Sequence, residues 1–463
     1  MKKIGLFLGF IALTLTSVAQ TAEQETLFLT LEKALEIALS ESPTIKIAEQ
    51  EIEIKRYAKQ ETYSSLYPRI DATAQYQRMI AKQSMSMTMN GVTQTIKVGS
   101  DNSFNGGITA SMPIINAQLW ESLKVSVADV MLSIEKARSS QIDMIEQVSK
   151  AYFATLLAKE SLVVYQRVYD NAVENNKNIQ KRYDVGSVSE YDLISSNVSV
   201  QNAIPNLIEA QNSVVLALWQ LKALLGIDLK KNIDVMGTLM DYEAQMNYAH
   251  TIDQLDFSNN TTLKQLDIQE GMLESALKIA KLADVPTLSI NAAYLYTALG
   301  NDGSFFQAKA WNPYSYAGLQ LNIPIFAGNQ RRAAKRQANL NLSNLQLQRE
   351  NVERQLRVSV VQSLNTMQTN VKKYSAAAAS VGQAKRGYEI AVKRYEVGRG
   401  TLVDVDNSQL ALTQAELGRN SAVYNFLVAK VALDKIIGNH EVKSEHDYID
   451  KYEAMYEKRY GDK

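Results

Sequence analysis

The chain of 463 residues has no cysteine, only three histidines and only seven prolines. Without cysteine there are no disulfides, no thiol chemistry and no thiolate ligands for zinc. The histidines, at positions 250, 440 and 446, are too scattered to suggest a metal site. No nucleophile motif, phosphate-binding loop or metal-ligand spacing occurs either. We therefore expect neither an enzyme nor a protein that needs a cofactor or a metal.

An excess of charge and a long apolar run are also missing. The 49 basic side chains are balanced by 49 acidic ones. No basic surface is indicated, so nucleic acid is not expected as a partner. After Gln20 there is no run of about 18 apolar residues, the length that a membrane-spanning helix needs. If the mature chain enters a membrane, we expect it to do so as a β-barrel.

The N-terminal residues have the pattern of a secretory signal peptide. Lys2 and Lys3 precede an apolar run from Ile4 to Leu15, and small residues precede Gln20. The run is too short to span a bilayer, and the small residues are typical of a cleavage site. We expect residues 1–19 to be removed after Ala19.

Two six-residue stretches of the chain are nearly identical. KRYDVG occupies residues 181–186, and KRYEVG occupies residues 393–398, 212 positions later. Further matching landmarks follow and precede them in the same order: Asp192 with Asp404, Gly226 with Gly438, residues 112–115 with 323–326, and residues 67–70 with 285–288. Such order indicates an internal duplication. We expect a first repeat at residues 20–226, a connecting segment at 227–250, a second repeat at 251–438 and a charged tail at 439–463.

Each repeat contains two stretches in which apolar and polar residues alternate. They begin near Ile70 and Phe104 in the first repeat and near Leu288 and Ala317 in the second. A period of two is typical of strands. We therefore predict four strands, with prolines at the junctions between strands and helices: Pro68, Pro113, Pro286 and Pro324.

Long helices are predicted after the second strand of each repeat. No glycine or proline lies between Pro113 and Gly186, and a helix over that stretch would be roughly 100 Å long. In both repeats apolar residues recur at steps of three and four, which indicates coiled-coil packing. Each long helix is expected to reverse at the glycine of its hexapeptide and to return to Gly226 or Gly438. Pro205 is expected to kink the first return.

Four strands cannot close a barrel, but three chains would supply twelve. The apolar rows would then face lipid and the polar rows a water-filled lumen. The alternative, a small sheet inside a soluble domain, is less favoured because no helix is left to cover the polar rows. The predicted lumen row is Thr73, Gln75, Thr109, Ser111, Ser289, Asn291, Gln320 and Asn322. Aromatic residues expected at the membrane interfaces are Tyr76, Tyr294, Tyr296, Trp311, Tyr314 and Tyr316.

The order of these features resembles the TolC-like outer membrane factor family, also called outer membrane efflux proteins. The resemblance rests on LEKALEIA at residues 31–38, LYP at 66–68, IPIFAG at 323–328 and the doubled hexapeptide with its following aspartate. It implies a homotrimer whose 12-stranded barrel lies in the outer membrane of a Gram-negative bacterium, on a helical tunnel that extends into the periplasm.

The resemblance also implies a function and partners. The trimer would be the exit duct of a tripartite efflux pump or a type I secretion system. Its partners would be a periplasmic adaptor protein, an inner membrane pump and outer membrane lipid. We retain one alternative, a coiled-coil structural protein of the cell envelope that forms no channel. The transported cargo and the class of pump cannot be read from the sequence.

The aspartates that follow each hexapeptide allow two interpretations. Residues 189–192 and 401–404 both read Ser/Thr-x-x-Asp, a capping box in which the acid lies near a helix N-terminus. The family resemblance instead implies a gate at these turns, made by Asp192, Tyr395, Asp404 and Asp406. Where the family has a second aspartate and a basic partner, this chain has Asn407 and Gly400. The sequence therefore does not define which groups would bond to each other in a closed gate.

Two further features invite interpretation. The helix-hairpin tips are the expected adaptor contacts: Val185, Gly186, Ser187, Val397, Gly398 and Arg399. Met85, Met87 and Met89 could offer thioether ligands to a soft metal ion. Their alternation toward Asn90-Gly91 is more typical of one face of a β-hairpin, and we favour the hairpin.

Overall fold

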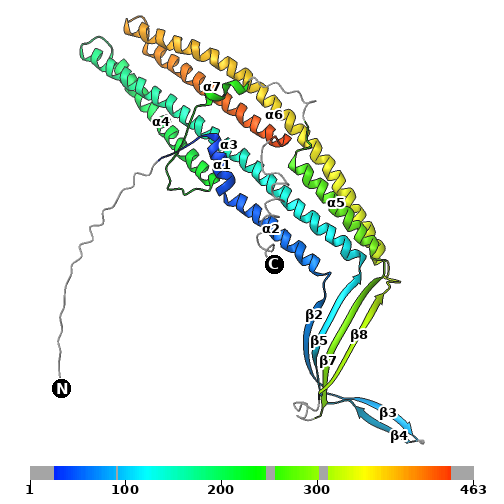
Figure 1. Cartoon of the computed structure of the whole chain (residues 1–463). Coiled ribbons are helices and arrows are strands. Elements are labelled where there is room, and N and C mark those ends of the chain that lie inside the picture. The colour runs from blue at the N-terminus through cyan, green and yellow to red at the C-terminus, as the bar shows by residue number, and fades with distance from the viewer. Residues whose placement is uncertain (1–25, 90–91, 247–255, 302–310, 440–463) are drawn as a thin grey trace, which may run out of the picture.

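The computed structural model describes residues 26–89, 92–246, 256–301 and 311–439. They form an elongated body in which a long helical part leads into a sheet at one end (Figure 1). The predicted signal peptide, residues 1–19, and residues 440–463 of the predicted tail lie outside the described residues. Across the described ranges, none of the helices combines the length and the apolar character needed to cross a bilayer.

The sheet has the four predicted strands. Every neighbouring pair is antiparallel, and the order is β2-β5-β7-β8. Pro68 and Pro286 directly precede strands, and Pro324 follows one, as predicted. Pro113 instead lies inside a strand, next to a register shift between Pro113 and Ile115, where its missing N–H is tolerated. The strands are β2 (Arg69–Arg78), β5 (Asn102–Ile115), β7 (Thr287–Gly300) and β8 (Trp311–Asn322).

The strand register gives the sheet two chemically different faces. Residues directly opposite each other on neighbouring strands share a face. Ala110 pairs with Ala292, which pairs with Ala317, on an apolar face. The eight residues predicted to form the lumen row all lie on the other face.

The same register divides the aromatic residues that we had grouped together. Trp311 pairs with Ala298 on the apolar face, where Phe104 packs edge-on against Trp311 with 4.6 Å between ring centroids. Tyr314 and Tyr316 pair with Leu295 and Ala293 on the polar face. Tyr314 and Tyr316 are three and five residues from Trp311 along β8, so they lie on the opposite face of the sheet from Trp311, and the six aromatic residues do not form one set.

Two smaller strand pairs accompany the sheet. β3 (Gln83–Met89) and β4 (Val92–Val98) form the favoured hairpin, and its turn at residues 90–91 lies outside the described residues. The base of the hairpin is fixed to the sheet, since Lys82 pairs with Asp101 and donates to Asn301. β1 (Leu27–Leu29) and β6 (Ile233–Val235) form a parallel pair that the sequence did not predict.

The N-terminal helical segment is broken in two. α1 (Leu31–Glu41) is capped by Thr30, and α2 (Pro43–Ser64) begins with Pro43. The break falls at Pro43 because a proline favours the first turn of a new helix over the interior of an old one. The counterpart in the second repeat, α5 (Thr261–Leu282), is unbroken.

The long helices follow the prediction closely. α3 (Ala117–Asp184) is 68 residues long and starts at the cap Asn116, and α6 (Gln330–Glu396) is 67 residues long. The returning helices are α4 (Glu190–Leu225), which continues through Pro205, and α7 (Leu402–Ile437). Both end at a left-handed glycine, Gly226 or Gly438, each with φ 69°.

The main hydrophobic core lies at the middle of the helical part. There β1, β6 and the short helix η1 (Leu239–Met246) pack against α3 and α7. Tyr152 is buried and donates to the carbonyl oxygen of Met236 at 2.6 Å. Burial raises the pKa of Tyr152 to about 12. Strand β6 and helix η1 of the predicted connecting segment thus pack against helices of both repeats and hold the repeats together.

The elements lie side by side in one consistent order. Near the sheet the helices follow as α2, α3, α5 and α6, and farther away as α4, α3, α7 and α6. The strands follow as β2, β5, β7 and β8. One long edge of the molecule therefore consists of β2, α2 and α4, and the opposite edge consists of β8 and α6.

Candidate functional site

The two hexapeptides end α3 and α6 at the end of the molecule farthest from the sheet (Figure 1). Gly186 and Gly398 have φ values of 72° and 71°, which side chains with a Cβ rarely adopt. The N–H of Ser187 donates to the carbonyl of Arg182 at 2.7 Å, and the N–H of Arg399 donates to that of Arg394 at 2.8 Å. Both copies are therefore Schellman turns with the same backbone geometry.

The aspartates that follow the turns cap the returning helices. The N–H of Asp192 donates to the Ser189 hydroxyl at 3.1 Å, and the Asp192 carboxylate accepts the Ser189 N–H at 3.3 Å. Thr401 and Asp404 repeat this arrangement at 3.2 and 3.0 Å. Hydrogen bonds from the Thr401 backbone and hydroxyl lower the pKa of Asp404. The capping-box interpretation is confirmed, and it leaves room for a second role in a gate.

The tyrosines of the two hexapeptides differ sharply in burial. Tyr183 is 38% exposed, whereas Tyr395 is 8% exposed in a cluster with Ile179 and Val405. The hydroxyl of Tyr395 is buried and has no hydrogen-bond partner among the described residues. Burial raises the pKa of Tyr395, the negative charge of Asp192 raises it further, and Arg182 opposes both.

Tyr395 lies at one of the contacts between the two repeats. The Arg182 guanidinium lies 5.3 Å from the centre of the Tyr395 ring and donates to the Tyr395 carbonyl at 3.4 Å. Two of the predicted gate residues from opposite halves of the chain also interact, since the negative charge of Asp192 acts on the hydroxyl of Tyr395. Arg182, which the sequence did not single out, binds the second of them.

Asp406 lies apart from the other predicted gate residues. Positions two apart on a helix face different directions, so Asp404 and Asp406 do not share a face of α7. The Asp406 carboxylate is half-buried between α7 and α4, where it accepts the Ser199 hydroxyl at 3.0 Å. Burial raises the pKa of Asp406. Its place in a constriction stays a prediction.

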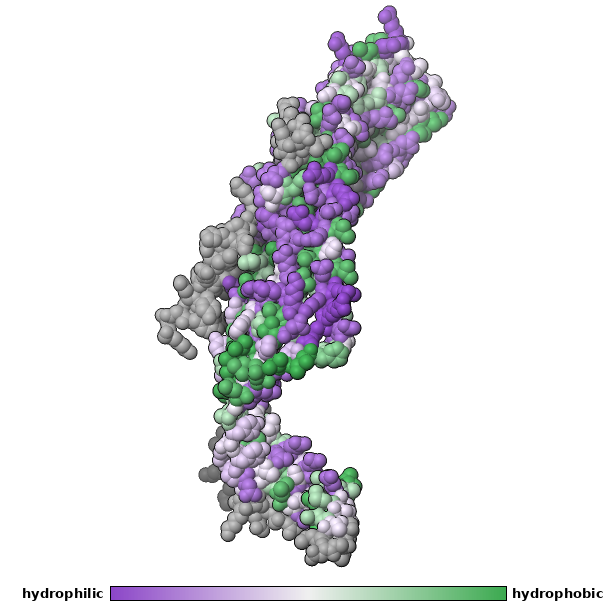
Figure 2. All heavy atoms as spheres, turned by 90° about the vertical axis from the view of Figure 1, so that its right-hand side faces the viewer, coloured by the Kyte–Doolittle hydropathy of each residue, from purple (hydrophilic) through white to green (hydrophobic). Residues whose placement is uncertain are grey.

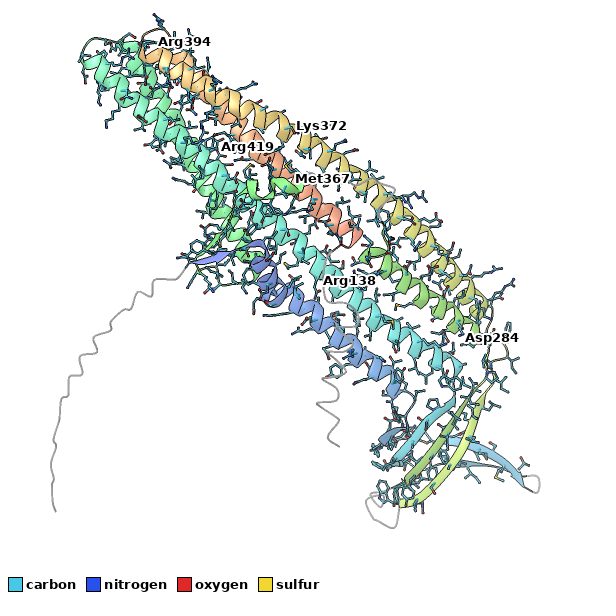
Figure 3. All side chains as sticks on the ribbon, turned by 45° about the horizontal axis from the view of Figure 1, so that its top comes forward. Arg138, Asp284, Met367, Lys372, Arg394 and Arg419 are labelled. Atoms are coloured by element: carbon cyan, nitrogen blue, oxygen red, sulfur yellow. The ribbon has the colours of Figure 1, made fainter. Side chains whose placement is uncertain are left out.

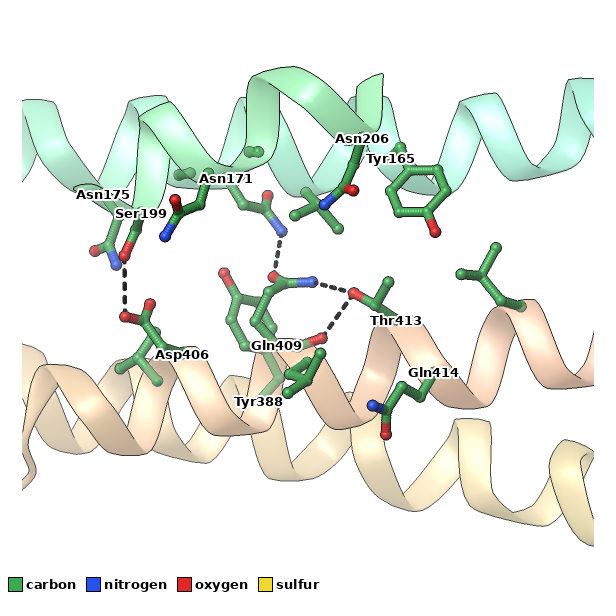
Figure 4. Close-up of a pocket in the computed structure, with 17 residues that line it drawn as sticks. Tyr165, Asn171, Asn175, Ser199, Asn206, Tyr388, Asp406, Gln409, Thr413 and Gln414 are labelled. Atoms are coloured by element: carbon green, nitrogen blue, oxygen red, sulfur yellow. Dashed lines mark hydrogen bonds between the residues drawn. The ribbon is translucent and has the colours of Figure 1, made fainter. Parts of the chain in front are cut away.

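Farther from the tips, more polar contacts join the α3–α4 hairpin to the α6–α7 hairpin. The Asn171 amide donates to Gln409 at 2.9 Å, and Arg167 pairs with Glu416 at 2.7 Å. These partners are 238 and 249 positions apart, and no local pattern in the sequence marks them. Asn171 and Gln409 line a cavity between the hairpins (Figure 4).

All six predicted tip residues are exposed. Val185 and Val397 expose 78% and 70% of their surface at corresponding positions of the two turns. Arg394, near the second tip (Figure 3), turns back and donates to the Arg399 carbonyl at 3.2 Å. Each tip therefore offers an exposed apolar side chain on a hydrogen-bonded turn.

The junction between helices and strands is held by charges and carries an apolar surface. Asp284 (Figure 3) pairs with Lys335 and with Arg331, and Arg331 also donates to the carbonyl of Pro324 at 2.9 Å. Apolar side chains gather where the helical part meets the strands (Figure 2). Ile325 and Phe326 there are 89% and 87% exposed. Within the described ranges, no three His, Cys, Asp or Glu side chains are placed to hold a metal ion.

Comparison with known proteins gives consistent matches. The family model described as outer membrane efflux protein matches residues 34–227 and 254–439, one range for each repeat. The alkaline protease secretion protein AprF of Pseudomonas aeruginosa is 22% identical over 412 residues, 85% of this chain and 81% of that protein. The outer membrane protein TolC of Escherichia coli is 21% identical over 348 residues, 73% of this chain and 70% of that protein. Among solved structures, the CmeC outer membrane channel of Campylobacter jejuni has a TM-score of 0.72 at 19% identity and covers 91% of this chain and 88% of its own.

Proposed function

Because the chain belongs to the outer membrane efflux protein family, we propose that it is an outer membrane exit duct of an efflux pump or a type I secretion system. The observation that carries this function is the pair of open edges on a sheet whose two faces differ in chemistry. Such a sheet is incomplete in one chain, and closure with further copies gives it both a lipid-facing wall and a polar lumen.

The open edges favour a homotrimer. Within the described residues, β2 and β8 each pair on one side only, and unpaired edges in a membrane have no water to bind their backbone groups. Three chains supply twelve strands, with β8 of one chain next to β2 of the following one. The helices have matching edges, so α6 of one chain would lie against α2 and α4 of the next.

A hollow along α6 supports this assembly. It is a shallow surface hollow of about 710 Å³, open to solvent and lined by residues of α6 alone, from Arg357 to Lys373. A helix of the neighbouring chain would fill the hollow.

The apolar face of the sheet has the height of a membrane. From Leu321 to Trp311 it runs ten residues along β8, which is about 33 Å along the strand and about 25 Å along the membrane normal at a tilt near 40°. This equals the apolar band of outer membrane barrels, about 25 Å. Aromatic side chains lie at both ends, with Tyr76 and Trp311 at one and Tyr67 and Phe326 at the other.

The tips would form the gate at the periplasmic end. Around a threefold axis, Asp192, Tyr395 and Asp404 would recur three times and narrow the mouth with a ring of acids, which favours cations. Asp406, on the other side of α7, would brace α7 against α4 through Ser199. The exposed tips, Val185 to Ser187 and Val397 to Arg399, would receive a periplasmic adaptor that links the duct to an inner membrane pump.

The absence of cysteine permits a direct test of the assembly. A chain with Thr73→Cys in β2 and Gln320→Cys in β8 should yield dimers and trimers on treatment with a bifunctional maleimide in outer membranes. The matched control is Thr109→Cys with Ala293→Cys, which pair across β5 and β7 within one chain and should leave it monomeric on denaturing gels.

Function is tested in planar bilayers. The purified trimer should form cation-preferring channels, and Asp192→Ala with Asp404→Ala should weaken that preference. A protein that sediments with the envelope but forms neither crosslinked trimers nor channels would be the coiled-coil structural protein instead.

A further inference from the structure

A cavity of about 490 Å³ lies between the two helical hairpins (Figure 4). Its walls come from α3, α4, α6 and α7 of a single chain. The volume falls within the range of small-molecule sites, roughly 300–1,000 Å³. Exit through the proposed duct would not require this cavity, because one chain alone lines the cavity, whereas three chains would share the lumen.

The cavity is lined by a concentration of amide side chains. Asn171 and Gln409 are joined by a hydrogen bond of 2.9 Å. Four more amides have no side-chain hydrogen bond to any other residue in the part of the chain that the structure describes: Asn175, Asn202, Asn206 and Gln414. Amides both donate and accept, so these four can bind polar groups of a ligand.

The charge of the cavity is negative and uncompensated. Asp406 is the only acid among its lining residues, and neither lysine nor arginine is among them. Its carboxylate receives one hydrogen bond, from Ser199. Arg167, on the α3 wall nearby, is already paired with Glu416. A half-buried carboxylate without a cationic partner is costly, and a cation supplied from outside would relieve that cost.

Aromatic rings complete the lining. Tyr165 comes from α3 and Tyr388 from α6, on opposite walls (Figure 4). Burial raises the pKa of Tyr388, and the negative charges of Glu174 and Asp406 raise it further. Faces of aromatic rings attract organic cations, with about 0.5–2 kcal/mol per contact.

We propose that this cavity binds a small organic cation, whose ammonium or similar charged group lies against Asp406 while its body lies between the two tyrosines. The unpartnered amides bind its polar substituents. The carboxylate disfavours an anion, and a single carboxylate is too few oxygen ligands for a calcium or magnesium ion. A neutral sugar would use the amides but leave Asp406 uncompensated.

Ethidium is a suitable probe because it is a planar cation whose fluorescence rises when it leaves water, and its charge does not change with pH. It is titrated into the full-length protein in mild detergent. We expect one site per chain. Asp406→Asn, which keeps an acceptor for Ser199, should weaken binding at least tenfold. The matched control Glu209→Gln removes an acid from the exposed face of α4 outside the cavity and should change affinity less than twofold.

Two more measurements separate a cation site from a generic polar groove. Tyr165→Leu should weaken ethidium several-fold, and maltose, a neutral polyhydroxy probe, should not compete with it. Equal affinity of the wild type and Asp406→Asn, or displacement by maltose, would overturn the proposal.

The pH dependence provides a third measurement. The acids near the cavity are Asp406, Glu174 and the paired Glu416, and acidification should weaken ethidium binding in the wild type and in Glu209→Gln far more than in Asp406→Asn. An equal acid response in all three would contradict a role for Asp406. Because one chain supplies the whole lining, a failure of trimer or channel formation would not affect these results.

Discussion

The two hexapeptides have the same backbone conformation, but their side chains have different surroundings. Both end a helix in a Schellman turn at a glycine with φ near 70°, and both lead into a capping box. Yet Tyr183 lies on the surface and Tyr395 lies in a core. Arg182 reaches across to the Tyr395 carbonyl, whereas the equivalent Arg394 returns to its own turn. The two copies have kept the turn that reverses the chain, but the side chains that join the two halves differ between them.

This comparison separates what the repeat encodes locally from what it acquires by assembly. A turn and its caps depend on residues within about six positions, so each copy makes them independently. The burial of a tyrosine depends on which helix comes to lie beside it. Function at the tip therefore rests on the asymmetry between the copies, and variants made in pairs can test it.

The largest expected effect comes from the tyrosines. Tyr395→Ala should remove a buried ring and the platform for Arg182, at a local cost of about 3–4 kcal/mol. We expect a lower midpoint of thermal unfolding and a higher channel conductance, because the two hairpins lose their contact at the mouth. Tyr183→Ala should change both quantities little. Equal effects of the two variants would mean that the asymmetry has no consequence.

The next largest effect concerns the loss of stability when glycine is replaced by alanine, at the tip and at the middle of the molecule. At Gly398 an added Cβ would meet nothing within 4 Å, but at Gly438 it would lie 2.4 Å from the carbonyl oxygen of Asn259. Gly398→Ala should cost about 1 kcal/mol, from the left-handed backbone alone. Gly438→Ala should cost roughly 3 kcal/mol, because steric overlap is added. Chemical unfolding monitored by circular dichroism measures both, and similar losses would contradict the crowding at Gly438.

Sequence reasoning reached the features that depend on local pattern. The duplication, the family, the four strands and the helix-ending glycines were predicted and are confirmed. The chemistry of the two sheet faces was also predicted, because it follows from alternation. The break at Pro43 was missed although a local signal was present, since Ser42-Pro43 is a common helix start.

The remaining features depend on which distant segments meet. Tyr395 and Tyr183 stand in nearly identical hexapeptides, and the burial of Tyr395 follows from packing against Ile179 and Leu402. The contact between Asp406 and Ser199 joins positions 207 apart, and the parallel pairing of β1 with β6 joins two strands of three residues. Such short and distant pairings leave no periodic signal in a single sequence.

Removing the hydroxyl that caps a returning helix should have a smaller effect on stability, and this effect should be the same in both copies. Thr401→Ala and Ser189→Ala each remove the hydroxyl that caps the returning helix, at about 1 kcal/mol. The conservative variant Thr401→Ser should restore stability because it keeps the hydroxyl. Thermal unfolding of the three variants checks this, and a large difference between Thr401→Ala and Ser189→Ala would show that the two capping boxes are not equivalent.

The smallest and most specific effect compares two acids on one helix. The pKa of Asp404 is lowered by its capping bonds, so its contribution to stability is present above the ordinary carboxyl pKa, about 4, and is lost as the pH falls through the lowered value. The pKa of Asp406 is raised by burial, so its contribution is present below about pH 4 and is lost as the pH rises through the raised value.

At pH 7 Asp404→Asn should therefore lower the unfolding midpoint, and Asp406→Asn should raise it by about 1–2 °C. Both differences from the wild type should shrink on acidification. Opposite signs from residues two positions apart would separate the acid that caps a helix from the acid that lines the cavity, whereas equal signs would place both in the same environment.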